Sequence, residues 1–203
     1  MMMINRFNIH ILVLFGFLYS GIAIPDSDSK NWTVLNDGKT WVEHKDYKGF
    51  PWCRSISDLP FSIDEIVPIV DNFDNYSNIF LRINDSRKIE ENIVYLKIDM
   101  PLFYSDRDYI VQYKSFEEND IVTYQWGSIQ HPEIPVFNDF VRLPDAAGEW
   151  RLTPINDSLT TVSYSWNGQL LGNFPSFGLT QAWSTQGLEI MSWLKEELEK
   201  SHD

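Results

Sequence analysis

The sequence predicts an α+β fold in which one long, curved antiparallel β-sheet is wrapped on a single long helix near the C-terminus. Three observations predict it. Alternating apolar and polar residues recur in short runs between residues 32 and 166, as half-buried strands require. Residues 175–200 instead place apolar side chains at spacings of three and four, the period of one helix face. With 203 residues, 43% of them hydrophobic and 15% aromatic, the chain can bury one core, and nothing indicates a second domain.

The first strands are expected at residues 32–35 and 41–45. Asn36-Asp37-Gly38 separates them, and Asp-Gly between two alternating runs favours a tight hairpin. A third strand is expected at residues 52–56. The sheet therefore begins as an antiparallel one.

Two short helices are expected next. Ser62 and Glu65 form a capping-box pattern, which predicts that a helix begins at Ile63. Pro68 lies inside the apolar stripe that follows, so this helix should be short or kinked. A second turn of helix is expected over residues 76–80.

The middle of the chain predicts strand after strand. Tyr109 and Val111 alternate with more polar neighbours, and so do Tyr124 and Trp126, so each pair should lie on the inner face of the sheet. At least six strands in one sheet are needed for this much alternation. They are expected at residues 88–91, 93–100, 108–116, 121–129, 140–143, 149–154 and 160–166.

The last element is predicted to be a helix over residues 175–200. At 1.5 Å per residue, roughly 25 residues span about 37 Å, enough to lie across a curved sheet. One long helix packed on a long antiparallel meander is the helix-grip architecture. Its apolar side carries Leu179, Trp183, Ile190 and Leu194.

The N-terminus has the pattern of an export signal. Arg6 precedes an apolar run at residues 9–19, and small residues lead to Ala23, where cleavage fits the small-x-small rule. The alternative, an uncleaved anchor, is less favoured because the run is shorter than the roughly 20 residues that cross a bilayer. We therefore expect a signal peptide at residues 1–23, a linker at 24–30, a single domain at 31–203, and a periplasmic or secreted location.

The net charge limits the partners of the chain, and the cysteine content limits its cross-links. A net charge of −13 argues against a nucleic-acid partner, because a surface that binds a phosphate backbone needs clustered Lys and Arg. The same charge repels anionic membranes over long range, so membrane contact should be transient. Cys53 is the only cysteine, so the chain can form no internal disulfide, and Cys53 is expected to be a small buried side chain.

The sequence contains no motif of a known catalytic or cofactor site. It has no Gly-x-Ser-x-Gly motif, no phosphate-binding glycine loop and no dinucleotide fingerprint. His44, His131 and His202 are isolated from one another, and His10 lies in the predicted signal. We expect no catalytic residue, no cofactor and no metal.

One stretch of sequence resembles a known family. Residues 99–111, Asp-Met-Pro-Leu-Phe-Tyr-Ser-Asp-Arg-Asp-Tyr-Ile-Val, resemble the signature of the START (StAR-related lipid transfer) family, in which a strand ends in Pro and Arg-Asp-Tyr/Phe opens the next strand. The resemblance extends to residues 148–154, 161–164 and 172–175 and covers most of residues 32–200. The chain departs from many members in lacking a long N-terminal helix and in carrying an export signal.

The resemblance implies a tunnel between the sheet and the terminal helix that holds one hydrophobic ligand, such as a sterol, a phospholipid or a sphingolipid. The loop before Arg107 and the helix would form its gate, and the protein is expected to be a monomer. The residues expected to line the cavity or its gate are Asp99, Arg107, Tyr109, Val111, Tyr124, Trp126, Leu179, Trp183, Ile190 and Leu194.

Two roles remain open for Arg107 and Asp108. One of them can orient a ligand head group, with Asp99 as a partner, or the pair can form a structural ion pair that fixes the loop to the sheet. Adjacent strand residues point to opposite faces, so at most one of the two faces the cavity.

Three functions remain open. The first is a lipid carrier or sensor. The second is a cyclase/aromatase-like helix-grip enzyme acting on a hydrophobic small molecule, which would need inward polar groups with perturbed titration. The third is a partner-binding module with a filled interior and an exposed apolar patch.

Overall fold

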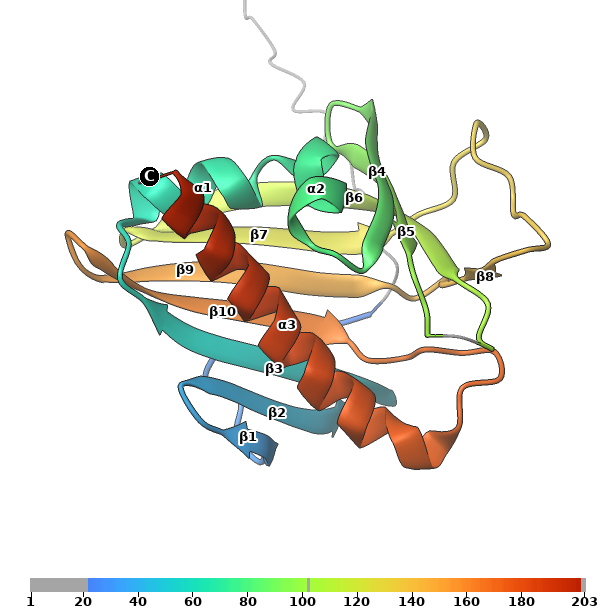
Figure 1. Ribbon diagram of the computed structural model, residues 1–203, viewed down its shortest axis with the longest axis horizontal. Helices are drawn as coiled ribbons and strands as arrows, with labels where there is room; N and C mark the ends of the chain where they lie inside the picture. The colour runs from blue at the N-terminus through green and yellow to red at the C-terminus, as the bar shows by residue number, and fades with distance from the viewer. Residues whose placement is uncertain (1–21, 102, 202–203) are drawn as a thin grey trace, which may run out of the picture.

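One curved sheet and one long helix dominate the computed structural model, which describes residues 22–101 and 103–201 (Figure 1). The signal predicted at residues 1–23 lies almost entirely outside the described residues. The strands are β1 (Thr33–Asp37), β2 (Thr40–Tyr47), β3 (Phe50–Leu59), β4 (Ile83–Glu90), β5 (Ile93–Ile98), β6 (Arg107–Glu118), β7 (Ile121–Ser128), β8 (Val141–Arg142), β9 (Ala147–Asn156) and β10 (Leu159–Asn167). The helices are α1 (Ile63–Val70), α2 (Tyr76–Ile79) and α3 (Leu179–Lys200), with short 3-10 turns η1 (Phe73–Asn75) and η2 (Ser176–Gly178).

The strands follow the order β1-β2-β3-β10-β9-β7-β6-β5-β4, and all neighbours in this order are antiparallel. The last strand, β10, therefore lies against β3, while α1 and α2 carry the chain from β3 to the far edge at β4. The helix α3 crosses the concave face of this sheet diagonally (Figure 1). The predicted helix-grip architecture is confirmed.

Two strands differ from the prediction. The strand expected at residues 140–143 contains only Val141 and Arg142, and it pairs with β6 in parallel. The strand expected to begin at residue 88 begins at Ile83. The first half of this strand has no apolar alternation. Its buried side chain is the polar Ser86, whose hydroxyl donates to the carbonyl of Phe73.

The predicted helix start at Ser62 is present. The carboxylate of Glu65 accepts hydrogen bonds from the Ser62 backbone N–H at 2.7 Å and from its hydroxyl at 2.6 Å. Pro68 lies inside α1, which ends two residues later at Val70, so the helix is short as expected.

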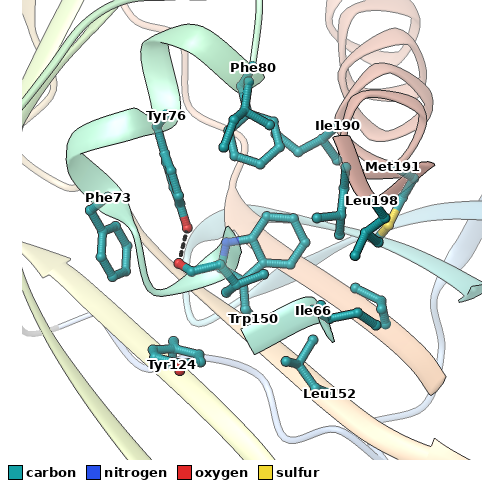
Figure 2. Close-up of a cluster of buried hydrophobic side chains, with 14 of the residues drawn as sticks. Ile66, Phe73, Tyr76, Phe80, Tyr124, Trp150, Leu152, Ile190, Met191 and Leu198 are labelled. Carbon is teal, nitrogen blue, oxygen red and sulfur yellow. Dashed lines mark hydrogen bonds between the residues drawn. The ribbon is translucent and has the colours of Figure 1, made fainter. Parts of the chain in front are cut away.

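The solid part of the core lies between the short helices, the C-terminal part of α3 and the middle of the sheet (Figure 2). Trp150, only 1% exposed, stands at its centre and stacks against Phe80. The Tyr76 hydroxyl donates to the Val70 carbonyl at 2.6 Å, which joins α2 to the end of α1. Each large apolar side chain buried here contributes roughly 1.5–3 kcal/mol to the free energy of folding. The cluster also contains Ile66, Leu152, Met191, Leu194 and Leu198.

The segment predicted to be a linker packs against the outer side of the first strands. Lys45 Nζ donates to the Ser29 hydroxyl and to the Lys30 carbonyl, each at 2.6 Å. Arg54 Nη1 donates to the Ser27 carbonyl at 2.8 Å. These contacts tie residues 27–30 to β2 and β3.

Candidate ligand cavity

A cavity of about 360 Å³ lies between the sheet and the N-terminal half of α3. A second cavity of about 30 Å³ lies deeper, towards Trp150 and Leu96. The two share a boundary, because both are lined by Phe80, Ile83, Tyr109, Trp126, Tyr164 and Ile190. The small cavity, called the inner extension below, therefore lies directly next to the large one.

One wall of the cavity is a row of stacked aromatic rings. Tyr164 stacks on Trp126, with ring centroids 5.6 Å apart, and on Trp166, at 5.1 Å. Gly148 of β9 lies between the two tryptophans in the sheet, paired with both. A Cβ atom at Gly148 would come within 2.2 Å of the Trp126 ring, so the missing side chain makes room for the row.

Arg107 fastens the two loops that border the cavity. Its side chain is completely buried, with Nε donating to the Leu170 carbonyl at 2.9 Å and Nη2 to that of Leu171 at 2.8 Å. Nη1 donates to the carbonyl of Ser105. Burial lowers the pKa of Arg107, and no carboxylate of the described residues lies within 4 Å of it. The guanidinium thus joins Ser105, in the loop before β6, to Leu170 and Leu171, in the loop after β10.

Asp108 points away from the cavity, as strand alternation predicts. Arg142 holds its carboxylate with two hydrogen bonds, of 2.8 and 2.7 Å. Asp99 lines the cavity, but its hydrogen bond comes from Asn84, at 3.3 Å. The ion pair expected between Arg107 and Asp108 is therefore absent from the described residues: Asp108 pairs with Arg142, and Arg107 binds backbone carbonyls.

A second contact joins α3 to the strand side of the cavity mouth. Arg82, just before β4, donates to Glu189 of α3 through Nε at 2.5 Å and Nη2 at 2.8 Å. Both side chains are partly exposed. The loop before β6 is held in turn by Asp106, which accepts from the Met100 N–H at 3.2 Å and pairs with Lys97.

Five of the ten predicted site residues line the main cavity, one lines only the small cavity, and four lie outside both. The five are Asp99, Arg107, Tyr109, Trp126 and Ile190, and the one is Val111. The four outside are Tyr124, Leu179, Trp183 and Leu194. Whether any of the ten contacts a ligand stays a prediction.

Three of the four outside residues are buried against protein instead, and Leu179 is partly buried against the cluster of Cys53, Trp166 and Trp183. Trp183 donates its indole N–H to the Gly168 carbonyl at 2.8 Å and packs on Cys53. Leu194 is completely buried in the main core, and Tyr124 packs near Phe73. Helix and strand periodicity indicates which side of an element is buried, but not whether that side meets a cavity or a core.

Several lining residues were not predicted. Tyr164 and Trp166 belong to the strand predicted at residues 160–166, and their alternation was a sufficient signal to add them. Gln186 lies three residues after Trp183 and four before Ile190, which was also a sufficient signal, whereas Phe80 gave none.

Exposed apolar side chains flank the cavity mouth. Phe103, in the loop before β6, is 100% exposed, and Phe177, in η2 before α3, is 89% exposed. Leu171, whose carbonyl binds Arg107, is also exposed. Beneath them the rings of Tyr104 and Phe174 meet at 5.1 Å, so the two loops touch.

Comparisons with known proteins find structural likeness only. No protein-family model matches the chain, and no curated protein matches it. The STAR-related lipid transfer protein from Xanthomonas axonopodis is 20% identical, with a TM-score of 0.72 over 84% of this chain and 99% of that one. Human STARD10 is 11% identical, with a TM-score of 0.76 over 91% and 83%. The Zhui aromatase/cyclase from a Streptomyces species is 12% identical, with a TM-score of 0.54 over 75% and 95%.

Proposed function

We propose that this chain, which has the START fold, binds one hydrophobic molecule in its cavity and carries it between membranes. The observation that carries the proposal is the cavity itself, about 360 Å³ with aromatic walls, bordered by two loops and α3. Apolar ligand surface buried there contributes about 25 cal/mol per Å². The similar structures described as lipid transfer proteins support the same function.

The size of the cavity agrees with a small-molecule site. Its volume of about 360 Å³ lies within the range of pockets that bind small organic ligands. The interior is not filled, which disfavours a partner-binding module.

Entry requires the loop at residues 101–106 and the first turns of α3 to separate. The contacts that must loosen are the Arg82–Glu189 ion pair and the packing of Tyr104 on Phe174. We expect opening, rather than ligand binding, to be the slow step.

Phe103, Phe177 and Leu171 offer an apolar contact to a bilayer at this mouth. The net charge of −13 opposes lasting attachment to an anionic surface, so contact is brief. No helix in the described ranges is long and apolar enough to span a membrane. Export to the periplasm or beyond remains part of the proposal.

Native mass spectrometry of the protein purified from its own source, followed by organic extraction, tests the proposal. One lipid bound per chain, and transfer of that lipid between donor and acceptor vesicles, is the expected result. A protein that is empty and extracts nothing from vesicles of mixed phospholipid, sterol and fatty acid would contradict it.

A cyclase/aromatase-like enzyme is the second candidate. It is favoured by the likeness to the Zhui aromatase/cyclase and by two tyrosines, Tyr109 and Tyr164, in the cavity wall. Mass spectrometry of the bound molecule before and after incubation separates the two candidates. An unchanged molecule supports a carrier, and one that has lost water on ring closure supports the enzyme.

A further inference from the structure

Two tyrosine hydroxyls at the inner boundary of the cavity have no hydrogen-bond partner within residues 22–101 and 103–201. Tyr109 of β6 and Tyr164 of β10 line both the main cavity and its inner extension. Neither hydroxyl is bonded to any described residue. The unpaired polar atoms that protein encloses completely belong to Trp52, Ser55, Thr123, Trp166 and Gln169. Because the two tyrosines are not among them, their hydroxyls reach the free space that these residues line.

The surroundings of these hydroxyls are uncharged. Burial raises the pKa of both, and the neighbouring Tyr109 raises that of Tyr164 further, so both stay protonated at neutral pH. The residues lining the inner extension are all uncharged. The charged residues of the main cavity, Arg82, Asp99 and Arg107, come from the segments at its mouth.

This electrostatic arrangement selects the polar group that a ligand can place there. A carboxylate, phosphate or ammonium would lose its hydration without meeting an opposite charge, which is costly. A tyrosine hydroxyl both donates and accepts, so it complements an uncharged carbonyl or hydroxyl oxygen. An unpaired buried hydroxyl is itself unfavourable, and such an oxygen would satisfy it.

The hydrocarbon next to that oxygen meets aromatic side chains. Trp126, Tyr164 and Trp166 stack on one another and all line the cavity. Ligand rings can make stacked or edge-to-face contacts with them, and rigid rings lose less conformational freedom on binding than a flexible chain does. The aromatic wall therefore favours a ring system.

We propose that the cavity binds a ring-containing amphiphile oxygen-first, with an uncharged carbonyl or hydroxyl oxygen at the hydroxyls of Tyr109 and Tyr164. The rings lie against the aromatic wall, and any charged or bulky group remains at the mouth near Arg82 and Arg107. This inference rests on the proposed function, because it names the chemistry of the ligand in the same cavity.

Equilibrium dialysis of the wild-type protein with two matched probes tests the inference. The probes are 2-acetylnaphthalene and 2-isopropenylnaphthalene, which have one shape and differ in a carbonyl oxygen replaced by a methylene carbon. Both are rigid two-ring molecules with one substituent, so a difference in binding reports on that one atom. We expect the ketone to bind about tenfold more tightly than the hydrocarbon.

Tyr109→Phe and Tyr164→Phe remove the hydroxyls and keep the rings. Each should weaken ketone binding about three- to tenfold and leave hydrocarbon binding unchanged. Tyr113→Phe is the matched control: it lies on the same strand as Tyr109, lines neither cavity, and donates its hydroxyl to the Glu91 carbonyl outside. It should leave the binding of both probes unchanged. Thermal unfolding of each variant verifies that it is folded.

Two outcomes separate the failure of this inference from the failure of the proposed function. Equal binding of ketone and hydrocarbon by the wild type, or equal weakening of both by the Phe variants, would overturn the oxygen site while leaving a hydrophobic cavity. Binding of neither probe by a folded protein that also carries no lipid would overturn both.

Discussion

The two halves of α3 differ in how much of their inner side packs against protein. The C-terminal half places Met191, Leu194 and Leu198 in the solid core, where each is at most 1% exposed, and it packs against α1 (Figures 1 and 2). The N-terminal half turns Ala182 and Gln186 towards the cavity. One helix therefore acts as an anchor at one end and as a cover at the other.

This difference shows how a protein can open a cavity without losing its fold. Gly187 lies at the junction, so close to β2 that a Cβ atom there would be 2.9 Å from Val42 Cγ1. Beyond this contact, Met191, Leu194 and Leu198 are held by close packing, and before it Ala182 and Gln186 face the cavity. The main apolar contact of the first turns is Trp183 on Cys53 and Trp166, so movement of these turns must loosen that cluster.

The largest effect should come from the anchored half. Leu194→Ala removes a completely buried side chain from the core and should lower the free energy of unfolding by about 3 kcal/mol. Gln186→Ala in the other half should change it by less than about 0.5 kcal/mol. Urea denaturation measures both. Similar losses for the two variants would break the distinction between anchor and cover.

The aromatic wall opposite the N-terminal half of α3 should tolerate substitution less well than that half of the helix. Gly148→Ala places a Cβ atom 2.2 Å from the Trp126 ring and 2.5 Å from the Ser165 carbonyl oxygen. We expect a loss of about 2 kcal/mol in unfolding free energy and weaker binding of the naphthalene ketone, because the ring must move into the cavity. Unchanged ketone affinity in the folded variant would indicate that the aromatic row does not contact the ligand.

High pH should lower the stability contributed by the core and by the cavity wall. Burial raises the pKa of Tyr76 in the core and of Tyr164 in the cavity wall above their value in the unfolded chain. The folded protein thus keeps protons that the unfolded chain loses near pH 10, so stability is complete below pH 10 and falls as the pH rises further. At pH 11, each such tyrosine should cost roughly 1.4 kcal/mol. Comparing urea denaturation at pH 8 and 11 tests this, since Tyr164→Phe should make the loss smaller by that amount.

The smallest effect on stability, but a direct one on dynamics, should come from the ion pair at the mouth. Glu189→Gln weakens the contact with Arg82. Because both side chains are partly exposed, the free energy of unfolding should change by less than about 1 kcal/mol. Ligand release should become about two- to fivefold faster, as measured by stopped-flow displacement of bound ketone. Lys195→Gln, which loses an exposed pair with Glu199 far from the mouth, is the control and should not alter release.

Local patterns predicted most of the fold. The capping box at Ser62, the Asp-Gly hairpin and the alternation at Tyr109 and Tyr124 each involve residues close in sequence, and each element formed where expected. The pairing of β3 with β10 has no local signal, because the partners are separated by about a hundred residues. The same holds for β8, whose pairing depends on residues of β6.

The site was predicted less completely for the same reason. Arg107 was identified from its motif, but its partners, the carbonyls of Leu170 and Leu171, lie 63 and 64 positions away in a loop without regular pattern. Trp183 and Ile190 share the apolar side of α3, yet one meets Cys53 and the other a cavity. Which of these a side chain meets depends on how the whole chain is packed around it.

The pairing of β3 with β10 also sets the order in which the molecule can be completed. During synthesis, β1 to β3 emerge early, but β3 has no second neighbour until Thr160 to Asn167 have been made. The edge of β3 stays unpaired through most of translation, and an unpaired edge is prone to wrong partners. A chaperone that holds the nascent chain would then be protecting this edge, and the cavity cannot exist before β10 has paired and α3 has covered the sheet.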